Sequence, residues 1–289
     1  KLVPAKEVGG DLYDFFIEDG KLFFIIGDVS GKGVPASLVM AVTCRLFRSV
    51  ASHLHSAHEI ISSLNNSLAD GNESNMFCTA FLGILDLETG HLQYCNAGHN
   101  PPLFKRNGEK FEYMKARSGM LLAGMEGIKY RKNEIQLVPG DKLYLYTDGV
   151  TEATDAGTQL YGEQRLLDFV NSLENTEPES LCKLIKEDVD KFVGTAPQFD
   201  DITMLCVRLN EVVKMTITTN PTMDSVAEVA SFVEEQLEKF ELPMKFATKL
   251  MVAVDELYSN IVRYSGATEA QVSVFKEENA IKLVFGDNG

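Results

Sequence analysis

The chain has 289 residues, of which 45% are hydrophobic and 24% charged, and this balance excludes disordered, collagen-like and low-complexity proteins. A chain of this length favours two domains over one ordinary core. Lysine and arginine number 27 against 42 aspartates and glutamates, so the net charge is −15. Because such a surface repels phosphate backbones and anionic lipid, we expect no nucleic-acid binding and no direct membrane contact. An acidic protein can still bind phosphate if it recruits metal cations.

The cysteines give no sign of disulfides or of a zinc site. Their number is odd, no two of them lie two residues apart, and all have apolar neighbours: Cys44, Cys78, Cys95, Cys182 and Cys206. This usage is typical of reduced thiols, so we expect a cytoplasmic protein. No apolar run approaches the ~20 residues of a membrane span, and no signal-peptide pattern opens the chain. Because the first residue is Lys1, we expect an excised piece of a longer protein.

Short β-rich runs alternate with helical stretches over the first two thirds of the chain. The apolar run at 21–27, bounded by turn residues, predicts a buried strand. Apolar residues at helical spacing predict a helix over 35–52, where Pro35 suits the first turn. Further strands are predicted at 77–86, 91–96, 111–114, 132–138, 142–147 and 201–209, and further helices at 56–69, 164–171 and 179–193. Because hairpins join so many of the strands, the pattern favours an α+β domain over a parallel sheet.

A second unit is predicted to begin near residue 210. Strands are expected at 212–218, 270–275 and 280–285, and helices at 224–240 and from 243 to about 264. We therefore expect two domains, 1–208 and 211–289. The second has a thin core, because it contains only three strands and two helices.

Acidic residues stand beside the predicted strands, several of them next to glycines. They are Asp11, Asp28, Asp148, Asp200 and Asp201. Carboxylates at the ends of buried strands can converge on one point, and a ligand set without His or Cys suits Mg²⁺ or Mn²⁺ better than zinc or copper. A single Asp beside Gly is more often a turn residue. The repetition of the pattern at four sites favours a metal centre.

Five motifs occur in an order that resembles a known enzyme family. They are GGDLYD at 9–14, GDVSGKGVPA at 27–36, NAGHNPP at 96–102, TDGV at 147–150 and DDIT at 200–203. Over about 1–208 the chain resembles the bacterial sporulation-protein-E-like branch of the metal-dependent (PPM) serine/threonine phosphatases. The resemblance implies an αββα sandwich, in which two antiparallel sheets carry helices on their outer faces, around two Mn²⁺ or Mg²⁺ ions.

The resemblance also implies six metal-binding positions: Asp11, Asp28, Val29 through its carbonyl, Asp148, Asp200 and Asp201. Asp28 would bridge the two ions, and Asp200 would be the direct ligand of its pair, with Asp201 supporting it or serving as an auxiliary ligand. Asp11, Asp28, Asp148 and Asp200 would then be the catalytic residues. In such centres the cations activate a water that attacks phosphorus, so no protein nucleophile is needed.

Two further residues in these motifs are weaker candidates. The segment around Lys32 lacks the Ser or Thr and the spacing of a P-loop, so a nucleotide loop is excluded. Eukaryotic relatives place an arginine near the substrate phosphate close to the start of the chain. Here the first arginine is Arg45, which leaves the metals, or more weakly Lys32, to hold the phosphate. His99 is expected in a structural turn rather than as a catalytic acid.

A second resemblance concerns residues 211–289. Glu256 and Asn260 lie four residues apart on the predicted helix and so share a face, either as a polar pair within the core or as a site. The segment VDELYSNIVRYSG at 254–266 resembles the asparagine box of the GHKL ATPases, specifically the serine kinases that act as anti-sigma factors. The resemblance implies Asn260 on Mg²⁺, Glu256 as general base and Asp287 on adenine. Since this chain lacks the lid and second glycine box, we expect a partial GHKL α/β sandwich with an incomplete ATP site. ATP with Mg²⁺ is expected only in a longer chain.

Together these patterns predict a metal-dependent phosphoserine/phosphothreonine protein phosphatase of a bacterial partner-switching pathway, with an appended kinase-like domain. The expected substrate is a phosphorylated anti-sigma-factor antagonist, and a sigma factor and a second copy of the chain are further candidate partners. One alternative is a non-catalytic module that binds a phosphoprotein or a sigma factor, but such a module has no need of the full carboxylate set. A sensor-kinase fragment would rest on the C-terminal helix alone.

Overall fold

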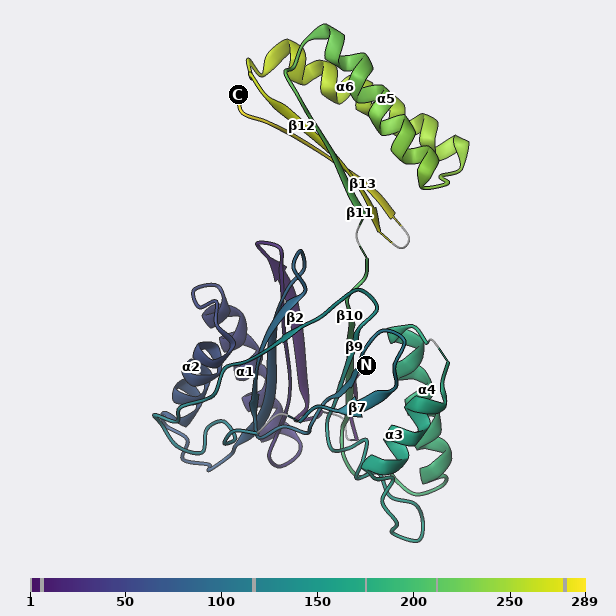
Figure 1. The fold of residues 1–289 in the computed structure, drawn as a ribbon. Coiled ribbons are helices and arrows are strands. Elements are labelled where there is room, and N and C mark those ends of the chain that lie inside the picture. Colours follow the sequence, from purple (N-terminus) through teal and green to yellow (C-terminus); the bar gives the residue numbers. More distant parts are fainter. Residues whose placement is uncertain (1, 6–7, 116–117, 175, 212, 278–279) are drawn as a thin grey trace. The chain divides into compact units, whose positions relative to one another are not determined.

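The computed structural model describes residues 2–5, 8–115, 118–174, 176–211, 213–277 and 280–289 (Figure 1). The chain divides into two compact units, Lys1–Leu209 and Asn210–Gly289. The division falls between the strand β10 (Ile202–Arg208) and the strand β11 (Val213–Thr219). Each unit has cores of its own, three in the first and one in the second among the described residues.

The first unit contains two five-stranded sheets in which all neighbouring strands are antiparallel. The first sheet has the order β2-β3-β4-β5-β8 and the second the order β1-β10-β9-β6-β7. The first is built from β2 (Leu12–Glu18), β3 (Lys21–Val29), β4 (Cys78–Asp86), β5 (His91–Ala97) and β8 (Asn133–Gln136). Besides β10, the second contains β1 (Leu2–Val3), β6 (Leu103–Lys105), β7 (Phe111–Tyr113) and β9 (Lys142–Tyr146).

Four helices cover the outer faces of the two sheets: α1 (Val34–Ala51), α2 (Ala57–Ala69), α3 (Glu163–Ser172) and α4 (Pro178–Val193). The first two lie beside the first sheet and the other two beside the second (Figure 1). Phe47 of α1 and Ile60 of α2 share a core with Ile25 of β3, and Ile185 of α4 shares one with Tyr144 of β9. The expected α+β arrangement of two antiparallel sheets flanked by helices is therefore confirmed.

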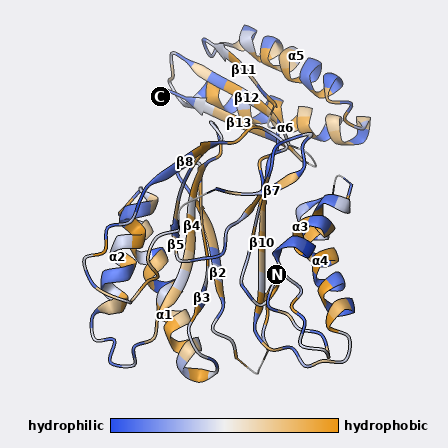
Figure 2. Cartoon of the chain, turned by 60° about the horizontal axis from the view of Figure 1, so that its bottom comes forward, coloured by the Kyte–Doolittle hydropathy of each residue, from blue (hydrophilic) through white to orange (hydrophobic). Residues whose placement is uncertain are grey.

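A third core fills the space between the two sheets. Phe24 and Phe81 contribute to it from the first sheet, and Leu143 and Leu145 from the second. Strands that are covered by helices on one face and by a sheet on the other must be apolar on both faces. The strands β3 and β4 are accordingly hydrophobic along most of their length (Figure 2). This double burial explains why the run at 21–27 is so clear in the sequence.

Three strands of the first unit are not predicted by the sequence pattern. The strands β1 and β6 are too short, at two and three residues, to show a period. The strand β2 (LYDFFIE) is interrupted by Asp14. Arg48 of α1 compensates this charge, because its Nε donates to Asp14 Oδ2 at 2.7 Å and its second guanidinium nitrogen pairs with Oδ1. A partner 34 residues away is not visible in a local pattern.

The helix α1 is 18 residues long and apolar enough to cross a membrane by length and composition alone. By that criterion the expectation that no run approaches a span is wrong for this segment. The core helix of a soluble protein passes the same test, and although only 22% of α1 is buried, its residues Ala36, Phe47 and Ala51 are fully buried against the first sheet and α2. The criterion is therefore weak support for a span.

The second unit is a three-stranded antiparallel sheet, in the order β11-β12-β13, with two helices. Besides β11 it contains α5 (Met223–Lys239), α6 (Met244–Tyr264), β12 (Ala270–Glu277) and β13 (Ala280–Asp287). Val229 of α5 and Tyr258 of α6 share a core with Val272 of β12. The helix α5 begins with a capping box, in which Thr222 and Ser225 each accept the other's backbone N–H. These elements are those expected from the sequence, and their assignment to the GHKL class stays a prediction.

Candidate metal centre

Four acidic residues come together where neighbouring strands of the two sheets begin and end. Asp11 directly precedes β2, and Asp28 is the penultimate residue of β3, its antiparallel neighbour. Asp148 follows β9 closely and Asp200 precedes β10, and these two strands also pair. Each sheet therefore contributes two carboxylates, and the charges of Asp148 and Asp200 reach Asp28 across the sandwich.

Gly149 allows the two strand ends of the second sheet to approach closely. A Cβ at this position would stand 1.9 Å from the backbone oxygen of Asp201 and 3.5 Å from the carbonyl carbon of Asp200. Only hydrogen fits at such a separation, so the backbone of Gly149 packs directly against this acidic pair. The Asp-Gly sequence at 148–149 therefore brings Asp148 close to Asp200, which a turn by itself would not require.

The Gly9-Gly10 pair has the same effect beside the first sheet. A Cβ on Gly9 would stand 2.2 Å from a carboxylate oxygen of Asp201, and one on Gly10 would stand 2.9 Å from the carbonyl oxygen of Val29. The Val29 carbonyl, for which the family resemblance implies a metal-ligand role, thus lies directly beside the loop that carries Asp11.

Asp11 is almost completely buried and is held by a threonine from the opposite sheet. Thr147 Oγ1 donates to Asp11 Oδ2 at 2.7 Å and itself accepts the backbone N–H of Thr203 at 3.0 Å. Burial raises the pKa of Asp11 to about 8, against the hydrogen bonds from both threonines and with a further contribution from the charge of Asp28. A cation placed beside a buried carboxyl stabilises its ionised form and so lowers its pKa.

The pKa values of Asp28 and Asp148 are also raised by burial and by neighbouring carboxylates. Burial raises the pKa of Asp28 to about 7, assisted by the charges of Asp148 and Asp200, while a hydrogen bond with Asp11 opposes the rise. Burial also raises the pKa of Asp148, followed by the charges of Glu152 and Asp200. The carboxylates therefore repel one another, and a cation among them would relieve that repulsion.

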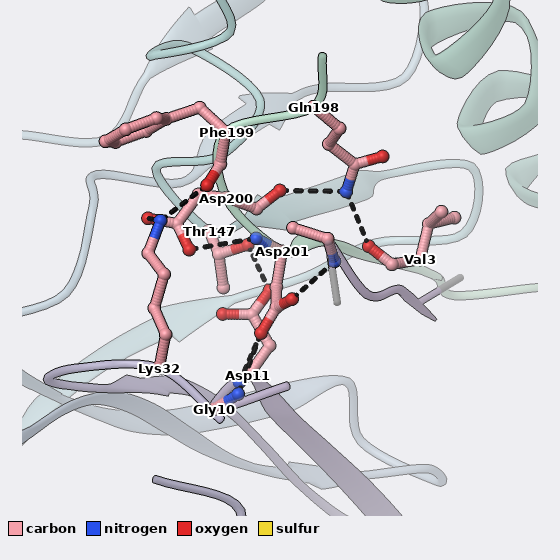
Figure 3. A network of polar contacts seen from close by, with 10 residues as sticks. Val3, Gly10, Asp11, Lys32, Thr147, Gln198, Phe199, Asp200 and Asp201 are labelled. Atoms are coloured by element: carbon pink, nitrogen blue, oxygen red, sulfur yellow. Dashed lines mark hydrogen bonds and ion pairs between the residues drawn. The ribbon is translucent and has the colours of Figure 1, made fainter. Parts of the chain in front are cut away.

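The adjacent residues Asp200 and Asp201 have different partners (Figure 3). Asp201 Oδ2 accepts the backbone N–H of Gly10 at 2.7 Å, and Oδ1 accepts that of Ala5 at 2.7 Å. Asp200 Oδ2 instead forms an ion pair with Lys32 at 2.9 Å. Both oxygens of Asp201 are thus engaged by backbone, which favours Asp200 as the direct ligand and Asp201 as its support. The ligand roles themselves stay predictions.

The donor chemistry of this cluster fits a hard divalent cation. Among the residues that the structure describes, no three His, Cys, Asp or Glu side chains already converge closely enough to hold an ion. The carboxylates of Asp11, Asp201 and Asp200 accept hydrogen bonds or ion pairs from the hydroxyl, backbone amide and ammonium donors described above. Oxygen ligands that carry net negative charge, without His or Cys, match the preference of Mg²⁺ and Mn²⁺.

His99 is a structural residue of the same region. It is buried, and the side chain of Asn96 accepts its backbone N–H at 2.8 Å and donates to its carbonyl at 3.0 Å. Its Nδ1 lies 3.0 Å from Thr79 Oγ1. Burial lowers the pKa of His99 to about 4, which favours the neutral ring at pH 7. These contacts agree with the structural turn expected from the sequence.

Two residues of the site were missed by sequence reasoning. Thr147, which holds Asp11, immediately precedes the Asp-Gly pair. Glu152 follows Asp148 by four residues, donates its backbone N–H to the Asp148 carbonyl at 2.7 Å, and raises the pKa of that carboxyl. A small hollow of about 30 Å³ beside it is lined by Gly149, Glu152 and Asp200 among others. The sequence TDGVTE at 147–152 could have indicated both residues, since they lie close to the candidate ligand Asp148.

The second unit places its candidate residues on the surface. Glu256 and Asn260 are exposed on α6, so the alternative of a polar pair buried in the core is wrong. Asp287 ends β13, is exposed, and accepts the backbone N–H of Gly289 at 3.1 Å. In the described part of the chain, no hydrogen bond or ion pair joins Asp287 to the two helix residues. Their roles toward ATP stay predictions.

Comparison with known proteins assigns the family. The family of stage II sporulation protein E (SpoIIE) matches residues 18–210, which is more than half of the chain. The chain belongs to the SpoIIE family. The matched region includes Asp28, Val29, Asp148 and the Asp200-Asp201 pair, whereas Asp11 precedes it.

Two curated relatives are similar to much of the chain. It is 31% identical to Protein IcfG of Synechocystis sp. over 235 residues, which is 72% of this chain and 37% of that protein. It is 29% identical to the phosphoserine phosphatase RsbU of Bacillus subtilis over 150 residues, which is 52% of this chain and 45% of that protein. The chain therefore spans less than half the length of these relatives.

Solved structures share the fold. The RsbU and RsbW domains of Rv1364c from Mycobacterium tuberculosis align over 93% of this chain and 79% of that one, with a TM-score of 0.63 and 24% identity. RsbX in complex with magnesium aligns over 73% of this chain and 93% of that one, with a TM-score of 0.56 and 18% identity. These likenesses show an α+β fold of the PPM type, followed by a small three-stranded sheet.

Proposed function

We propose that this chain is a metal-dependent protein-serine/threonine phosphatase of the PPM type. One observation carries the proposal: carboxylates from both sheets, Asp11 and Asp28 with Asp148 and Asp200, meet where burial and mutual repulsion favour a bound cation. The family assignment supports it, because a relative within the family, RsbU, is named a phosphoserine phosphatase.

The chain's own residues would hold and orient the oxygen donors. The proposed ligands are Asp11, Asp28, the Val29 carbonyl, Asp148 and Asp200, with Asp201 supporting them. Divalent Mn²⁺ or Mg²⁺ would supply activation of water and neutralisation of the phosphate charge. Thr147 orients Asp11 through its hydroxyl. Asp201 fixes the segment that precedes Asp11, because its carboxylate accepts the backbone N–H groups of Gly10 and Ala5. Donors that are positioned before the substrate arrives need little reorganisation during reaction.

The proposed substrate is a phosphoserine or phosphothreonine on a folded protein, specifically a phosphorylated anti-sigma-factor antagonist in the cytoplasm. Asp28, Asp148 and Asp200 are only partly buried, so the cluster opens to the surface. A phosphate carried on a protein can reach such a site, and with a net charge of −15 the rest of the surface offers it little attraction.

We also propose that the second unit is a partial GHKL domain related to the anti-sigma serine kinases, which would rephosphorylate the same substrate or hold a sigma factor. The support is the segment at 254–266 and the structure from Mycobacterium tuberculosis, whose RsbW domain accompanies an RsbU domain. The exposure of Glu256 and Asn260 on α6 is compatible with a ligand site.

Hydrolysis of a phosphoserine peptide tests the phosphatase proposal. The chain should release phosphate in Mn²⁺ and lose this activity in EDTA. Asp148→Asn should lose at least ~10²-fold in turnover, as expected for a group that acts electrostatically on the reaction. A binding module would retain the phosphopeptide without releasing phosphate, and that result would contradict the proposal.

A further inference from the structure

Lys32 reaches from the loop between β3 and α1 to the segment that precedes β10 (Figure 3). Its Nζ lies 2.9 Å from Asp200 Oδ2, donates to the carbonyl oxygen of Phe199, and stands 4.0 Å from the centroid of the Phe199 ring. A carboxylate, a carbonyl and an aromatic face therefore hold one ammonium at the edge of the carboxylate cluster. The side chains of Lys32 and Asp200 are 30% and 26% exposed, so the pair is within reach of solvent.

The ion pair uses Oδ2 of Asp200, and the other oxygen of this carboxylate already has a partner. Asp200 Oδ1 already accepts the backbone N–H of Asp201 at 2.9 Å, and Oδ2 is the oxygen paired with Lys32. A dication at Oδ2 would replace the attraction between carboxylate and ammonium by repulsion between two cations. A cation bound at this oxygen would therefore displace the ammonium.

The displaced ammonium has somewhere to remain. The Phe199 carbonyl and ring belong to the backbone and side chain of a neighbouring residue, and neither is a proposed metal ligand. A lysine ammonium is a compact point charge with three donors on a flexible stem, so it can exchange one acceptor for another by bond rotation. It then stands beside the cluster with donors free for an anion.

We propose that Lys32 is the counter-ion of Asp200 in the metal-free chain and the phosphate-binding cation of the metal-loaded chain. The ligand class is a phosphate monoester dianion or the inorganic phosphate that its hydrolysis releases. The inference rests on the proposed function and names the residue that recognises the substrate's phosphate. It gives this acidic chain a cationic phosphate contact although its first arginine, Arg45, lies on α1.

Three variants test the proposal with the whole 289-residue chain. Lys32→Met keeps the aliphatic stem and removes the charge, whereas Lys32→Arg keeps the charge. Lys132→Met is the matched control, because Lys132 forms a comparable exposed ion pair with Glu134, at 2.6 Å. This pair lies at β8, which is one edge strand of the first sheet, whereas β2 is the other. Isothermal titration measures the Kd of Mn²⁺ for each chain and then the Kd of inorganic phosphate for each metal-loaded chain.

Lys32→Met should bind Mn²⁺ about threefold tighter or more, because the competing ammonium is gone, and should bind phosphate at least about tenfold weaker (~1.4 kcal/mol). Lys32→Arg should bind phosphate within about threefold of wild type, and Lys132→Met should change neither constant. Changes in opposite directions separate this role from damage to the loop, which would weaken both. Unchanged or weaker Mn²⁺ binding by Lys32→Met, or unchanged phosphate binding, would overturn the proposal.

The titrations do not depend on turnover, so the two proposals can fail separately. A chain that shows these shifts but hydrolyses no phosphoserine peptide contradicts the proposed function and supports the role of Lys32. A chain that hydrolyses the peptide while Lys32→Met matches wild type in both constants overturns the role of Lys32 alone. A wild-type chain that binds no Mn²⁺ contradicts both.

Discussion

The carboxylate of Asp201 accepts the backbone N–H of Gly10 at 2.7 Å across a sequence separation of 191 residues. Its other oxygen accepts the backbone N–H of Ala5 at the same distance. One buried side chain at the start of β10 therefore fixes the loop that carries Asp11 beside the first sheet. The neighbouring Asp200 is partly exposed and has Lys32 as its ion-pair partner.

Asp200 and Asp201 should consequently differ in their effect on stability. Asp201→Ala leaves the N–H groups of Gly10 and Ala5 without acceptors, at about 1–3 kcal/mol each when buried, so we expect a loss of about 2–4 kcal/mol in unfolding free energy. Asp200→Ala should cost less than about 1 kcal/mol, because its pair is partly exposed, and should weaken Mn²⁺ binding at least about tenfold. Urea denaturation in EDTA and Mn²⁺ titration measure these effects. Equal losses of stability would contradict the division of roles.

Gly149→Ala should disrupt the site through sterics alone. The new Cβ would stand 1.9 Å from the Asp201 carbonyl oxygen, so the backbone must move. We expect a loss of at least ~2 kcal/mol in unfolding free energy and weaker Mn²⁺ binding. Gly286→Ala is the control, because a Cβ there has nothing within 4 Å, and its effect should lie within about 0.5 kcal/mol. Wild-type metal binding by Gly149→Ala would contradict the close approach.

In the metal-free chain, Asp28→Asn should increase the unfolding free energy at neutral pH, because it removes a buried charge. Burial and the charges of Asp148 and Asp200 raise its pKa to about 7 from a usual value of 3.8. The folded state therefore binds more protons than the unfolded state between these values, and stability falls as pH rises through that window. In EDTA, Asp28→Asn should match wild type near pH 4 and exceed it increasingly up to about pH 7. Urea denaturation across this pH range measures the difference in unfolding free energy between the two chains. In saturating Mn²⁺ the order should reverse, with wild type more stable than Asp28→Asn. A difference independent of pH would argue against it.

The 289-residue chain should bind Mg·ATP weakly or not at all. Glu256, Asn260 and Asp287 would supply contacts to Mg²⁺, water and adenine. The affinity of such sites for phosphate comes from backbone N–H donors, and the expected incomplete site lacks the lid and second glycine box that would provide them. The acidic surface also opposes a tetra-anion. Isothermal titration with Mg·ATP measures the affinity, and a micromolar Kd would show that the proposed incomplete site is wrong.

The sequence predicts most of the fold because burial leaves a periodic record in it. The run at 21–27 is apolar on both faces and becomes β3, and the helix at 35–52 becomes α1. The strand β2 leaves no such record, because Asp14 interrupts it and its compensating Arg48 lies on α1. Short strands such as β6 depend on their neighbours and show no period of their own.

At the site, the sequence motifs predict which carboxylates belong together but not how each one is used. Asp200 and Asp201 are adjacent letters, yet one pairs with an ammonium and the other with two backbone N–H groups. The contact of Lys32 with Asp200 joins two loops from different sheets, and such pairing arises only when the sandwich closes. Thr147 was missed for the same reason, since its acceptor Asp11 lies 136 residues away.

The most direct test of the central claim compares wild type with Asp28→Asn in the hydrolysis of a phosphoserine peptide, at pH 7 with and without Mn²⁺. Circular dichroism in the same buffer verifies that both chains are folded. Wild type should release phosphate only with the metal, and Asp28→Asn should be slower by at least ~10²-fold, because it lacks the carboxylate proposed to lie between the two ions. Hydrolysis by folded Asp28→Asn at the wild-type rate, or by wild type in EDTA, would contradict the account.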